Sequence, residues 1–183
     1  MALGEELAVL LLVALRLDAA GIAYMVSGSV AMNHYAEPRM TRDIDIVVSV
    51  EAGDARRITA LFEPDFICEL EAVESAIRRR GMWNIIHREW IVKVDFVVRK
   101  DTPFHREEFA RRRRVRLDGQ ELSIVTAEDL VLSKLLWAKD SRSELQLRDV
   151  RNLLRCGEAL DWDYIERWAS TLSVSALLDE VRS

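Results

Sequence analysis

The sequence has few of the residues that mark fibrous, disordered or disulfide-rich chains. Its 183 residues include only 7 glycines, 3 prolines and 2 cysteines. Collagen-like and low-complexity chains need far more glycine and proline, so both classes are excluded. Cys68 and Cys156 are isolated, without a CxxC pair or a neighbouring histidine, and they predict neither a disulfide framework nor a zinc site. We expect a reducing, cytoplasmic setting from this cysteine usage.

Long apolar runs and an excess of basic charge are also missing. The apolar segment 7–15 is too short to span a bilayer, which needs about 20 residues. Glu5 and Glu6 precede it where a signal peptide would carry positive charge. The 26 basic and 31 acidic side chains give a net charge of -5, which argues against a protein that coats nucleic acid non-specifically. With 50% hydrophobic residues, the composition is that of a soluble globular protein without a membrane partner.

Strand and helix patterns alternate along the larger, N-terminal part of the chain. Short apolar runs and alternation predict strands at residues 22–27, 43–48, 82–87 and 90–98, and a hairpin over 115–125 that turns at Asp118-Gly119. Helical spacing predicts helices at residues 5–20, 29–35, 54–62, 71–80 and 103–110. From Thr126 onward the pattern is wholly helical, with helices at residues 126–139, 144–155 and 161–170 and a last short one. Trp137, Trp162 and Trp168 in this tail are expected to be packing residues.

Two carboxylates lie two residues apart on the expected strand 43–48. Because side chains alternate along a strand, Asp43 and Asp45 share one face while Ile44 and Ile46 fill the other. Carboxylates about 7 Å apart along a strand repel each other unless a cation lies between them. A solvated edge strand explains an isolated Asp-x-Asp better, so the pair gains meaning only with further partners.

A third acid, Asp95, lies within the apolar strand expected at residues 90–98, where Lys93 shares its face. Burying a lone carboxylate in so apolar a segment is costly unless an ion pair or a metal ion compensates it. An ion pair with a nearby arginine is the simpler explanation for Asp95 alone. Set beside Asp43 and Asp45, the same residue favours a metal site.

A possible phosphate site precedes these acids. Gly28-Ser29 stands where an expected strand meets an expected helix. Glycine lets a backbone approach a phosphate closely, and the free N–H groups at a helix start attract anions. Alone the dipeptide is equally well an ordinary helix start. Its position upstream of the acidic pair is what favours a phosphate site at Gly28-Ser29.

Together these segments resemble the nucleotidyltransferase superfamily, the polymerase-β-like fold. The family pattern of Gly-Ser, a helical spacer, a flanked Asp-x-Asp and a later carboxylate is matched by Val26-Ser27-Gly28-Ser29, Asp43-Ile44-Asp45-Ile46 and Val94-Asp95-Phe96. Residues 39–45 look most like the minimal branch that contains abortive-infection (AbiEii-type) toxins. The resemblance implies an α+β fold in which a mixed β-sheet is flanked by helices and followed by a C-terminal helical tail. Residues 1–125 would then be the catalytic core, and 126–183 a helical region packed on it.

The resemblance also implies roles for single residues. In such enzymes two Mg²⁺ ions clamp the attacking and leaving oxygens of an in-line displacement. Asp43 and Asp45 would hold both ions, and Asp95 would hold the one nearest the incoming hydroxyl and help to deprotonate it. Gly28 and Ser29 would bind the β- and γ-phosphates of a nucleoside triphosphate. The reaction implied is transfer of a nucleoside monophosphate to a hydroxyl acceptor with release of pyrophosphate.

Two cations are further candidates for binding the nucleotide. Lys134 is the only charged residue between Leu130 and Ala138, so a phosphate contact, as in several relatives, and snorkelling to solvent are both open. Arg42, beside Asp43, could steady a phosphate or the acceptor, although a surface arginine is the simpler explanation.

Toxins of this branch often carry a Lys-Asp-x-x-Asp-like helix. Here residues 148–152 place an amide where one carboxylate belongs, which leaves the role of that helix open.

The acceptor stays open between a tRNA end, a protein side chain and a small molecule such as an aminoglycoside. The acidic composition slightly favours a cationic acceptor, whereas arginine clusters at residues 78–80 and 106–116 could hold an RNA backbone. The toxin branch further implies an antitoxin partner. A non-catalytic nucleotide-binding member of a toxin–antitoxin pair is the alternative function, and the three intact acids argue against it. Other Asp-x-Asp enzymes, such as phosphatases and glycosyltransferases, fit the flanking residues less well.

Overall fold

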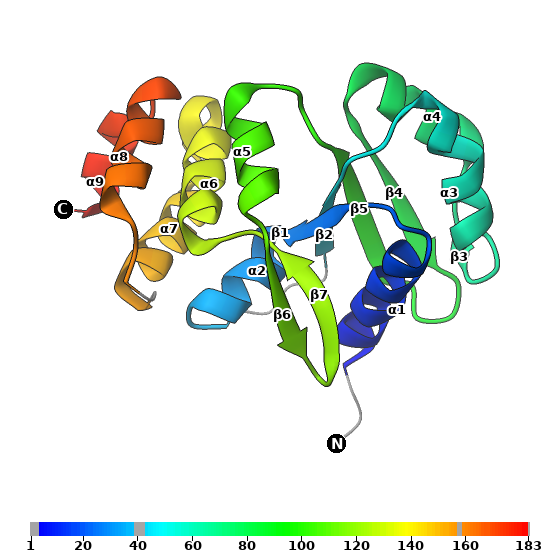
Figure 1. Cartoon of the computed structure of the whole chain (residues 1–183). Coiled ribbons are helices and arrows are strands. Elements are labelled where there is room, and N and C mark those ends of the chain that lie inside the picture. The colour runs from blue at the N-terminus through cyan, green and yellow to red at the C-terminus, as the bar shows by residue number, and fades with distance from the viewer. Residues whose placement is uncertain (1–3, 39–42, 157–158, 183) are drawn as a thin grey trace.

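The computed structural model of the chain describes residues 4–38, 43–156 and 159–182. Its strands are β1 (Tyr24–Ser27), β2 (Asp43–Val48), β3 (Phe66–Ile67), β4 (Met82–His87), β5 (Lys93–Val98), β6 (Arg113–Leu117) and β7 (Gln120–Ile124). Within the described ranges they form one seven-stranded mixed sheet in the order β3-β4-β5-β2-β1-β7-β6 (Figure 1). The pairs β2–β5 and β1–β7 are parallel, and the other neighbours are antiparallel.

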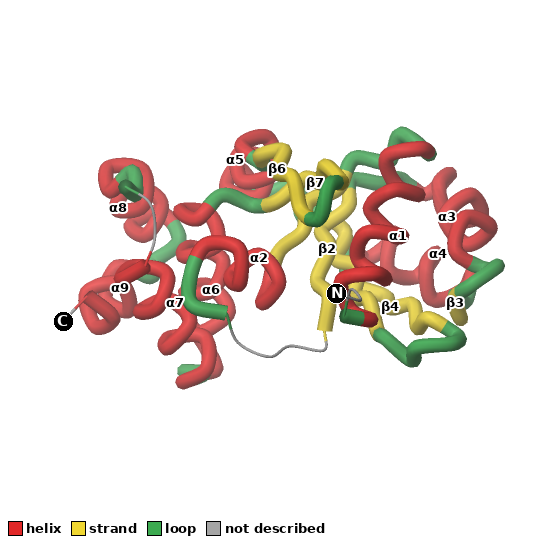
Figure 2. The backbone as a smooth tube through the Cα atoms, turned by 90° about the horizontal axis from the view of Figure 1, so that it is seen from below, coloured by secondary structure: helices red, strands yellow, loops and turns green. Residues whose placement is uncertain are grey.

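Helices cover both faces of this sheet. They are α1 (Glu5–Ala19), α2 (Gly28–Tyr35), α3 (Ala55–Phe62), α4 (Leu70–Arg79), α5 (Pro103–Arg111), α6 (Ala127–Ser141), α7 (Glu144–Cys156), α8 (Trp162–Thr171) and α9 (Ser175–Arg182). Helices α1, α3 and α4 lie on one face, whereas α2 and α5 to α9 lie on the other (Figures 1 and 2). The predicted α+β fold with a C-terminal helical tail is confirmed. No helix in the described part of the chain is long and apolar enough to cross a membrane.

The face of the sheet toward α1, α3 and α4 is packed with apolar side chains, which belong to a hydrophobic core that also includes residues of α6 to α9. Alternate residues of the two central strands are buried there: Ile44, Ile46 and Val48 of β2, and Val94, Phe96 and Val98 of β5. The Phe96 ring stacks on Trp83 of β4 with centroids 4.9 Å apart and lies 5.5 Å from Phe62 of α3. Because side chains alternate, the acids of β2 and β5 are directed to the opposite face, as the sequence pattern predicts.

The structure departs from the predicted elements in two short segments. The two-residue strand β3 was not predicted, because a segment of this length has no readable period. Strand β5 begins at Lys93, not Trp90, because Ile91 has a left-handed φ of 54° and the backbone turns there. The predicted hairpin turn is confirmed, since Asp118 and Gly119 both have positive φ, as a two-residue type I′ turn requires.

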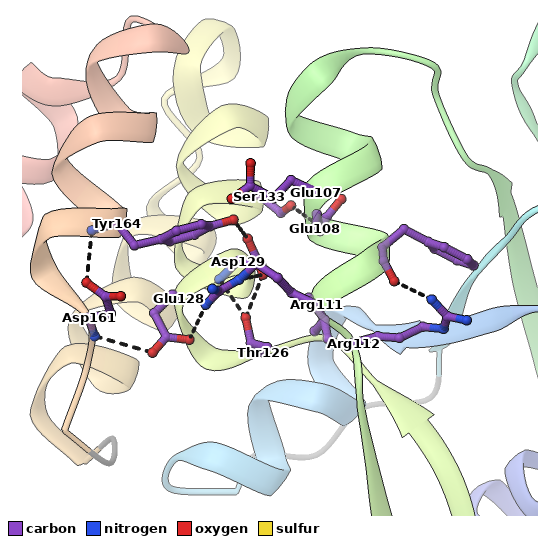
Figure 3. A network of polar contacts seen from close by, with 12 residues as sticks. Glu107, Glu108, Arg111, Arg112, Thr126, Glu128, Asp129, Ser133, Asp161 and Tyr164 are labelled. Atoms are coloured by element: carbon purple, nitrogen blue, oxygen red, sulfur yellow. Dashed lines mark hydrogen bonds and ion pairs between the residues drawn. The ribbon is translucent and has the colours of Figure 1, made fainter.

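A buried polar cluster joins α5, α6 and α8 (Figure 3). The carboxylate of Asp129, which is fully buried, accepts hydrogen bonds from Thr126 Oγ1 (2.6 Å), Arg111 Nε (3.1 Å) and Tyr164 OH (2.5 Å). Burial raises the pKa of Asp129, and these three donors oppose that rise. The Arg111 guanidinium also lies 3.8 Å from the centroid of the Tyr164 ring. This cluster therefore holds the C-terminal helix α8 against the two helices that face the sheet.

We expect Asp129→Ala to cost about 3–5 kcal/mol of unfolding free energy, because it leaves the Arg111 cation and two hydroxyls without their acceptor. Tyr164→Phe removes one donor and should cost only about 1 kcal/mol. Urea unfolding of both variants measures the difference. Equal losses would show that Asp129 does not organise the cluster.

Candidate functional site

Three side chains from three adjacent strands form a row across the sheet. Asp45 of β2 is the register partner of Ser27 on β1 and of Asp95 on β5. Neighbouring strands are about 4.8 Å apart, so the two carboxylates leave the same face side by side. Asp43 lies two residues earlier on this face, at the start of β2, with its side chain 61% exposed. The structure thus brings together the three acids that the sequence separates by up to fifty residues.

Gly28 holds the Asp45 carboxylate against the start of α2. Its φ is +60°, and a Cβ built on it would lie 1.9 Å from Asp45 Oδ2. Only a residue without a side chain allows this approach. β1 passes into α2 at Gly28 without a loop, so the first N–H groups of the helix, which have no intrahelical acceptor, lie beside the acids. Ser29 follows as the second residue of α2 and lines the same site.

The acids interact electrostatically. Burial raises the pKa of Asp45, and the nearby carboxylates of Asp95 and Asp43 raise it further. The ammonium of Lys93 lies 2.8 Å from Asp95 Oδ2 and 3.5 Å from Asp43 Oδ1. The hydrogen bond to Asp95 is the largest cause that raises the pKa of Lys93. The ion pair considered for Asp95 therefore exists, with Lys93 as its partner and not an arginine.

These acids fit a magnesium site that substrate oxygens complete. Among the residues that the structure describes, no three His, Cys, Asp or Glu side chains gather closely enough to hold a metal by themselves. Mg²⁺ binds through one or two carboxylates together with water and phosphate oxygens, so an open row of carboxylates suits it. Burial and then repulsion by Asp95 and Asp43 raise the pKa of Asp45, and a divalent cation would relieve the repulsion. A cation must compete with Lys93, whose side chain is 40% exposed and so has room to rotate away.

A cleft of about 270 Å³ opens over Ser27 and Asp45 of this row, and its lining does not include Asp95 or Asp43. One wall is the β1–α2 junction with Ser27, Gly28 and Ser29 beside Asp45, and the opposite wall comes from α5 and α6 with Glu108, Ser133, Lys134 and Trp137. Trp137 is 66% exposed, so the expectation that it packs in the core is wrong, whereas Trp168 is buried as expected. The cleft therefore combines a helix N-terminus, carboxylates, a lysine and an exposed aromatic ring.

Lys134 reaches this cleft from α6 through a buried side chain. Its Nζ donates to Asp149 Oδ2 (2.8 Å) and to Gln146 Oε1 (3.1 Å), both on α7. Its positive charge lowers the pKa of Asp45, against the larger effects of burial and the other acids. Only 4% of Lys134 is exposed, so snorkelling to solvent is wrong, and the phosphate contact stays a prediction. Arg42 and its neighbour Arg39 lie outside the described residues.

Two residues of the site were not predicted from the sequence: Asp149, whose helix had no assigned role, and Glu108, which was missed. The helix at residues 148–152, whose role was open, supplies Asp149 as the buried partner of Lys134. Glu108 of α5 is 4% exposed and accepts a hydrogen bond from Ser133 Oγ (2.6 Å). Burial raises the pKa of Glu108 to about 7. Its helical spacing from the buried Phe104 is the signal that could have placed it on the inner face of α5.

We expect Gly28→Ala to destabilise the protein by at least about 1 kcal/mol more than Gly119→Ala. Both positions have positive φ, but a Cβ at Gly119 meets nothing within 4 Å, whereas one at Gly28 meets the Asp45 side chain. Gly119→Ala is thus a control for backbone strain alone. Chemical denaturation measures both, and equal costs would contradict the close packing of Gly28 on Asp45.

Glu108 makes stability depend on pH. Its pKa is about 7 in the folded protein against about 4.5 when unfolded, so folding takes up a proton between these values. This group therefore disfavours the folded state progressively as pH rises through that window. Glu108→Gln, which keeps an acceptor for Ser133, should gain about 2–3 kcal/mol relative to the native chain between pH 5 and pH 8.

Unfolding curves at the two pH values test this expectation. Glu107→Gln is the matched control, because Glu107 faces Arg167 at 3.2 Å on the outer side of α5. The control variant should show no such gain at high pH. A Glu108→Gln variant whose stability follows the native chain at both pH values would contradict the assignment.

Comparison with known proteins gives matches in structure and none in sequence. No protein-family model and no curated protein matches the chain. An antigenic nucleotidyltransferase-like protein from Paracoccidioides brasiliensis has a TM-score of 0.59 at 17% identity, over 83% of this chain and 77% of that one. The antibiotic-resistance factor ANT(2'')-Ia has a TM-score of 0.58 at 12% identity, over 96% and 95%. The lincosamide antibiotic adenylyltransferase LnuA, solved with lincomycin bound, has 0.53 at 13%, over 83% and 96%.

These identities are low, so the likeness concerns the fold. It extends over most of each chain. The abortive-infection branch within the superfamily is not confirmed by these neighbours. The chain has the fold of the nucleotidyltransferases.

Proposed function

We propose that the protein is a Mg²⁺-dependent nucleotidyltransferase, which moves a nucleoside monophosphate from a nucleoside triphosphate to a hydroxyl and releases pyrophosphate. The observation that carries the proposal is the register of Ser27, Asp45 and Asp95 on adjacent strands, with Asp45 packed against the Gly28 start of α2. The anion site and the Asp45 carboxylate then share one cleft, with Asp95 beside Asp45 on the next strand. Structural neighbours that are named as adenylyltransferases support the same chemistry.

The nucleotide would lie with its phosphates at the β1–α2 junction. Gly28 and Ser29 provide backbone N–H groups at the positive end of a helix, where β- and γ-phosphates bind favourably. Lys134 closes the opposite side and is oriented by Asp149, so its ammonium would meet a phosphate oxygen. Arg42, next to Asp43 in the sequence, is a further candidate for this role.

The transfer step needs a base and a leaving group. The acceptor oxygen forms a bond to the α-phosphorus, the bond from that phosphorus to the β-bridging oxygen breaks, and pyrophosphate leaves. We assign the acceptor proton to the carboxylate of Asp95, which lies on the side of the row away from Ser27. Asp43 and Asp45 would hold two Mg²⁺ ions and Asp95 one of them, and the ions would supply charge neutralisation at the phosphates. Lys93 must leave Asp95 before that carboxylate can act.

The remaining parts of the proposal concern organisation and partners. Residues 1–125 would carry the catalytic acids, and residues 126–183 would close the nucleotide site through Lys134 and Asp149. The acceptor is an RNA, a protein or a small molecule. ANT(2'')-Ia is named an antibiotic-resistance factor and LnuA a lincosamide antibiotic adenylyltransferase, which makes the last class chemically accessible to this fold. A cytoplasmic location and an antitoxin partner stay predictions, and co-purification with the product of an adjacent gene would test the second.

We expect Asp95→Asn to lower transfer by about 100-fold or more while nucleoside triphosphate binding is retained, because the variant loses the base but keeps the α2 anion site. Asp45→Asn should abolish transfer and also remove the thermal stabilisation that Mg²⁺ gives the native chain. Release of labelled pyrophosphate and calorimetric binding of the nucleotide measure the two effects separately.

Asp118→Asn is the matched control, since Asp118 is exposed at a hairpin turn remote from the acids, where asparagine tolerates the positive φ. It should leave both readouts unchanged. Nucleotide binding by the native chain without transfer to any acceptor would favour the non-catalytic, nucleotide-binding alternative. Full activity of both Asp95→Asn and Asp45→Asn would show that the roles are wrongly assigned.

A further inference from the structure

A second cavity, of about 870 Å³, lies on the other side of α7 from the acidic cleft. We call it the arginine groove and define it by Arg148, Arg151 and Arg155 of α7, Arg182 of α9 and Trp162 of α8. Among the described residues, its acidic lining consists of Glu37, after the end of α2, and Asp149, which is already paired with Lys134. The groove is therefore positively charged in a protein whose net charge is -5.

The three arginines of α7 have no acidic partner among the described residues. Their spacing of three and four residues places them along one side of the helix, where like charges repel. By contrast, the arginine cluster at residues 106–116 is largely occupied by ion pairs: Arg106 with Asp101, Arg111 with Asp129, Arg114 with Asp18 and Arg116 with Glu121. In the cluster at residues 78–80, Arg80 faces Glu51 at 3.8 Å. The charges of Arg148, Arg151 and Arg155 are therefore available to an external anion, and they line a cavity.

The groove also offers an aromatic surface. Trp162 is half-buried in its lining, and the Arg182 guanidinium lies 4.3 Å from the centroid of the Trp162 ring. Arg182 itself is held by Glu166 at 2.8 Å. Proteins that bind single-stranded nucleic acid combine a positive groove along the backbone with aromatic rings on which bases stack. An anionic peptide would use the arginines but has no comparable use for the half-buried ring.

Lys134 connects the arginine groove to the acidic cleft. Gln146 lines the cleft and Asp149 lines the groove, and both accept hydrogen bonds from the same Lys134 ammonium. Pro38, at the groove, is five residues before Asp43, so their Cα atoms are at most about 18 Å apart. A polymer lying in the groove can therefore place its end among the acids.

We propose that the arginine groove binds the phosphodiester backbone of a single-stranded RNA whose terminal hydroxyl is the acceptor in the cleft. This inference rests on the proposed nucleotidyl transfer and names its substrate class. The arginines span about 10 Å along α7, which matches about three successive phosphates of one strand. Guanidinium groups bind phosphates in bidentate fashion, and the three on α7 disfavour a cationic acceptor such as an aminoglycoside.

Binding is tested first, without nucleotide and without Mg²⁺, so that catalysis plays no part. Fluorescence anisotropy of a labelled single-stranded RNA oligonucleotide with a free 3′ end is compared for the native chain and an R148E/R151E double variant. The variant should bind about tenfold more weakly or worse, and its salt dependence should fall by about 1.4 in log–log slope, because two phosphate contacts are lost. R148Q/R151Q, with less effect on folding, should reduce the slope in the same direction.

The matched control is R78E/R79E on α4, which makes the same change of charge on the opposite face of the sheet. It should leave RNA binding within about twofold of the native value. Equal loss in the control and the α7 variant would overturn the proposal, and so would binding that neither variant changes. A polyglutamate peptide that displaces the RNA and binds more tightly would also overturn it, in favour of an acidic protein.

Transfer is tested second, with the same RNA, nucleoside triphosphates and Mg²⁺. The native chain should extend the RNA by one nucleotide, and an oligonucleotide with a blocked 3′ hydroxyl should bind but not be extended. Groove-dependent RNA binding without any nucleotide transfer would support the groove and count against the proposed function. Transfer to a small molecule without groove-dependent RNA binding would support the proposed function and overturn the proposal for the arginine groove.

Discussion

Parallel pairing of β2 with β5 is the constraint on which the site depends. It places Asp45 beside Asp95, at a cost of about 3 kcal/mol for two like charges about 5 Å apart at an effective dielectric constant of about 20. The opposite face of the same strands buries six apolar side chains, each worth about 1.5–3 kcal/mol. Burial therefore exceeds repulsion, and a shift of one residue would expose the apolar face. The core enforces a charge arrangement that the acids alone would avoid.

The repulsion is reduced by cations from other parts of the chain. Lys93 shares the face of Asp95 and bonds it directly, whereas Lys134 acts across the cleft from α6. Asp149 fixes Lys134 through a pair whose side chains are only 5% and 2% exposed. The C-terminal helices therefore contribute to the site as well as to packing, because α6 supplies Lys134, whose charge faces the acids, and α7 supplies Asp149, which orients it.

Sequence reasoning placed the strands and the three acids because alternation is a local signal with a fixed period. The apolar partners of Asp45 and Asp95 identified both strands, and Gly28 marked a turn that the positive φ confirms. Residues whose environment comes from distant segments were harder to predict. Glu108 meets Ser133 and Lys134 meets Asp149 only through helix packing, and neither pair has a spacing in the sequence that indicates contact. Arginine runs drew attention to residues 106–116, although acids elsewhere in the chain occupy them.

A shared fold does not determine the acceptor, because the parts that meet it differ from the parts that hold the acids. ANT(2'')-Ia and LnuA match 96% and 83% of this chain at 12% and 13% identity, so the likeness concerns the fold and not the residues that would meet an acceptor. On the side of α7 away from the cleft, this chain presents Arg148, Arg151 and Arg155, which have no acidic partners among the described residues. A protein that accepts cationic molecules gains from acids at that position, whereas guanidinium groups there repel them. The charge of α7 therefore bears on the acceptor more directly than the identity of any structural neighbour.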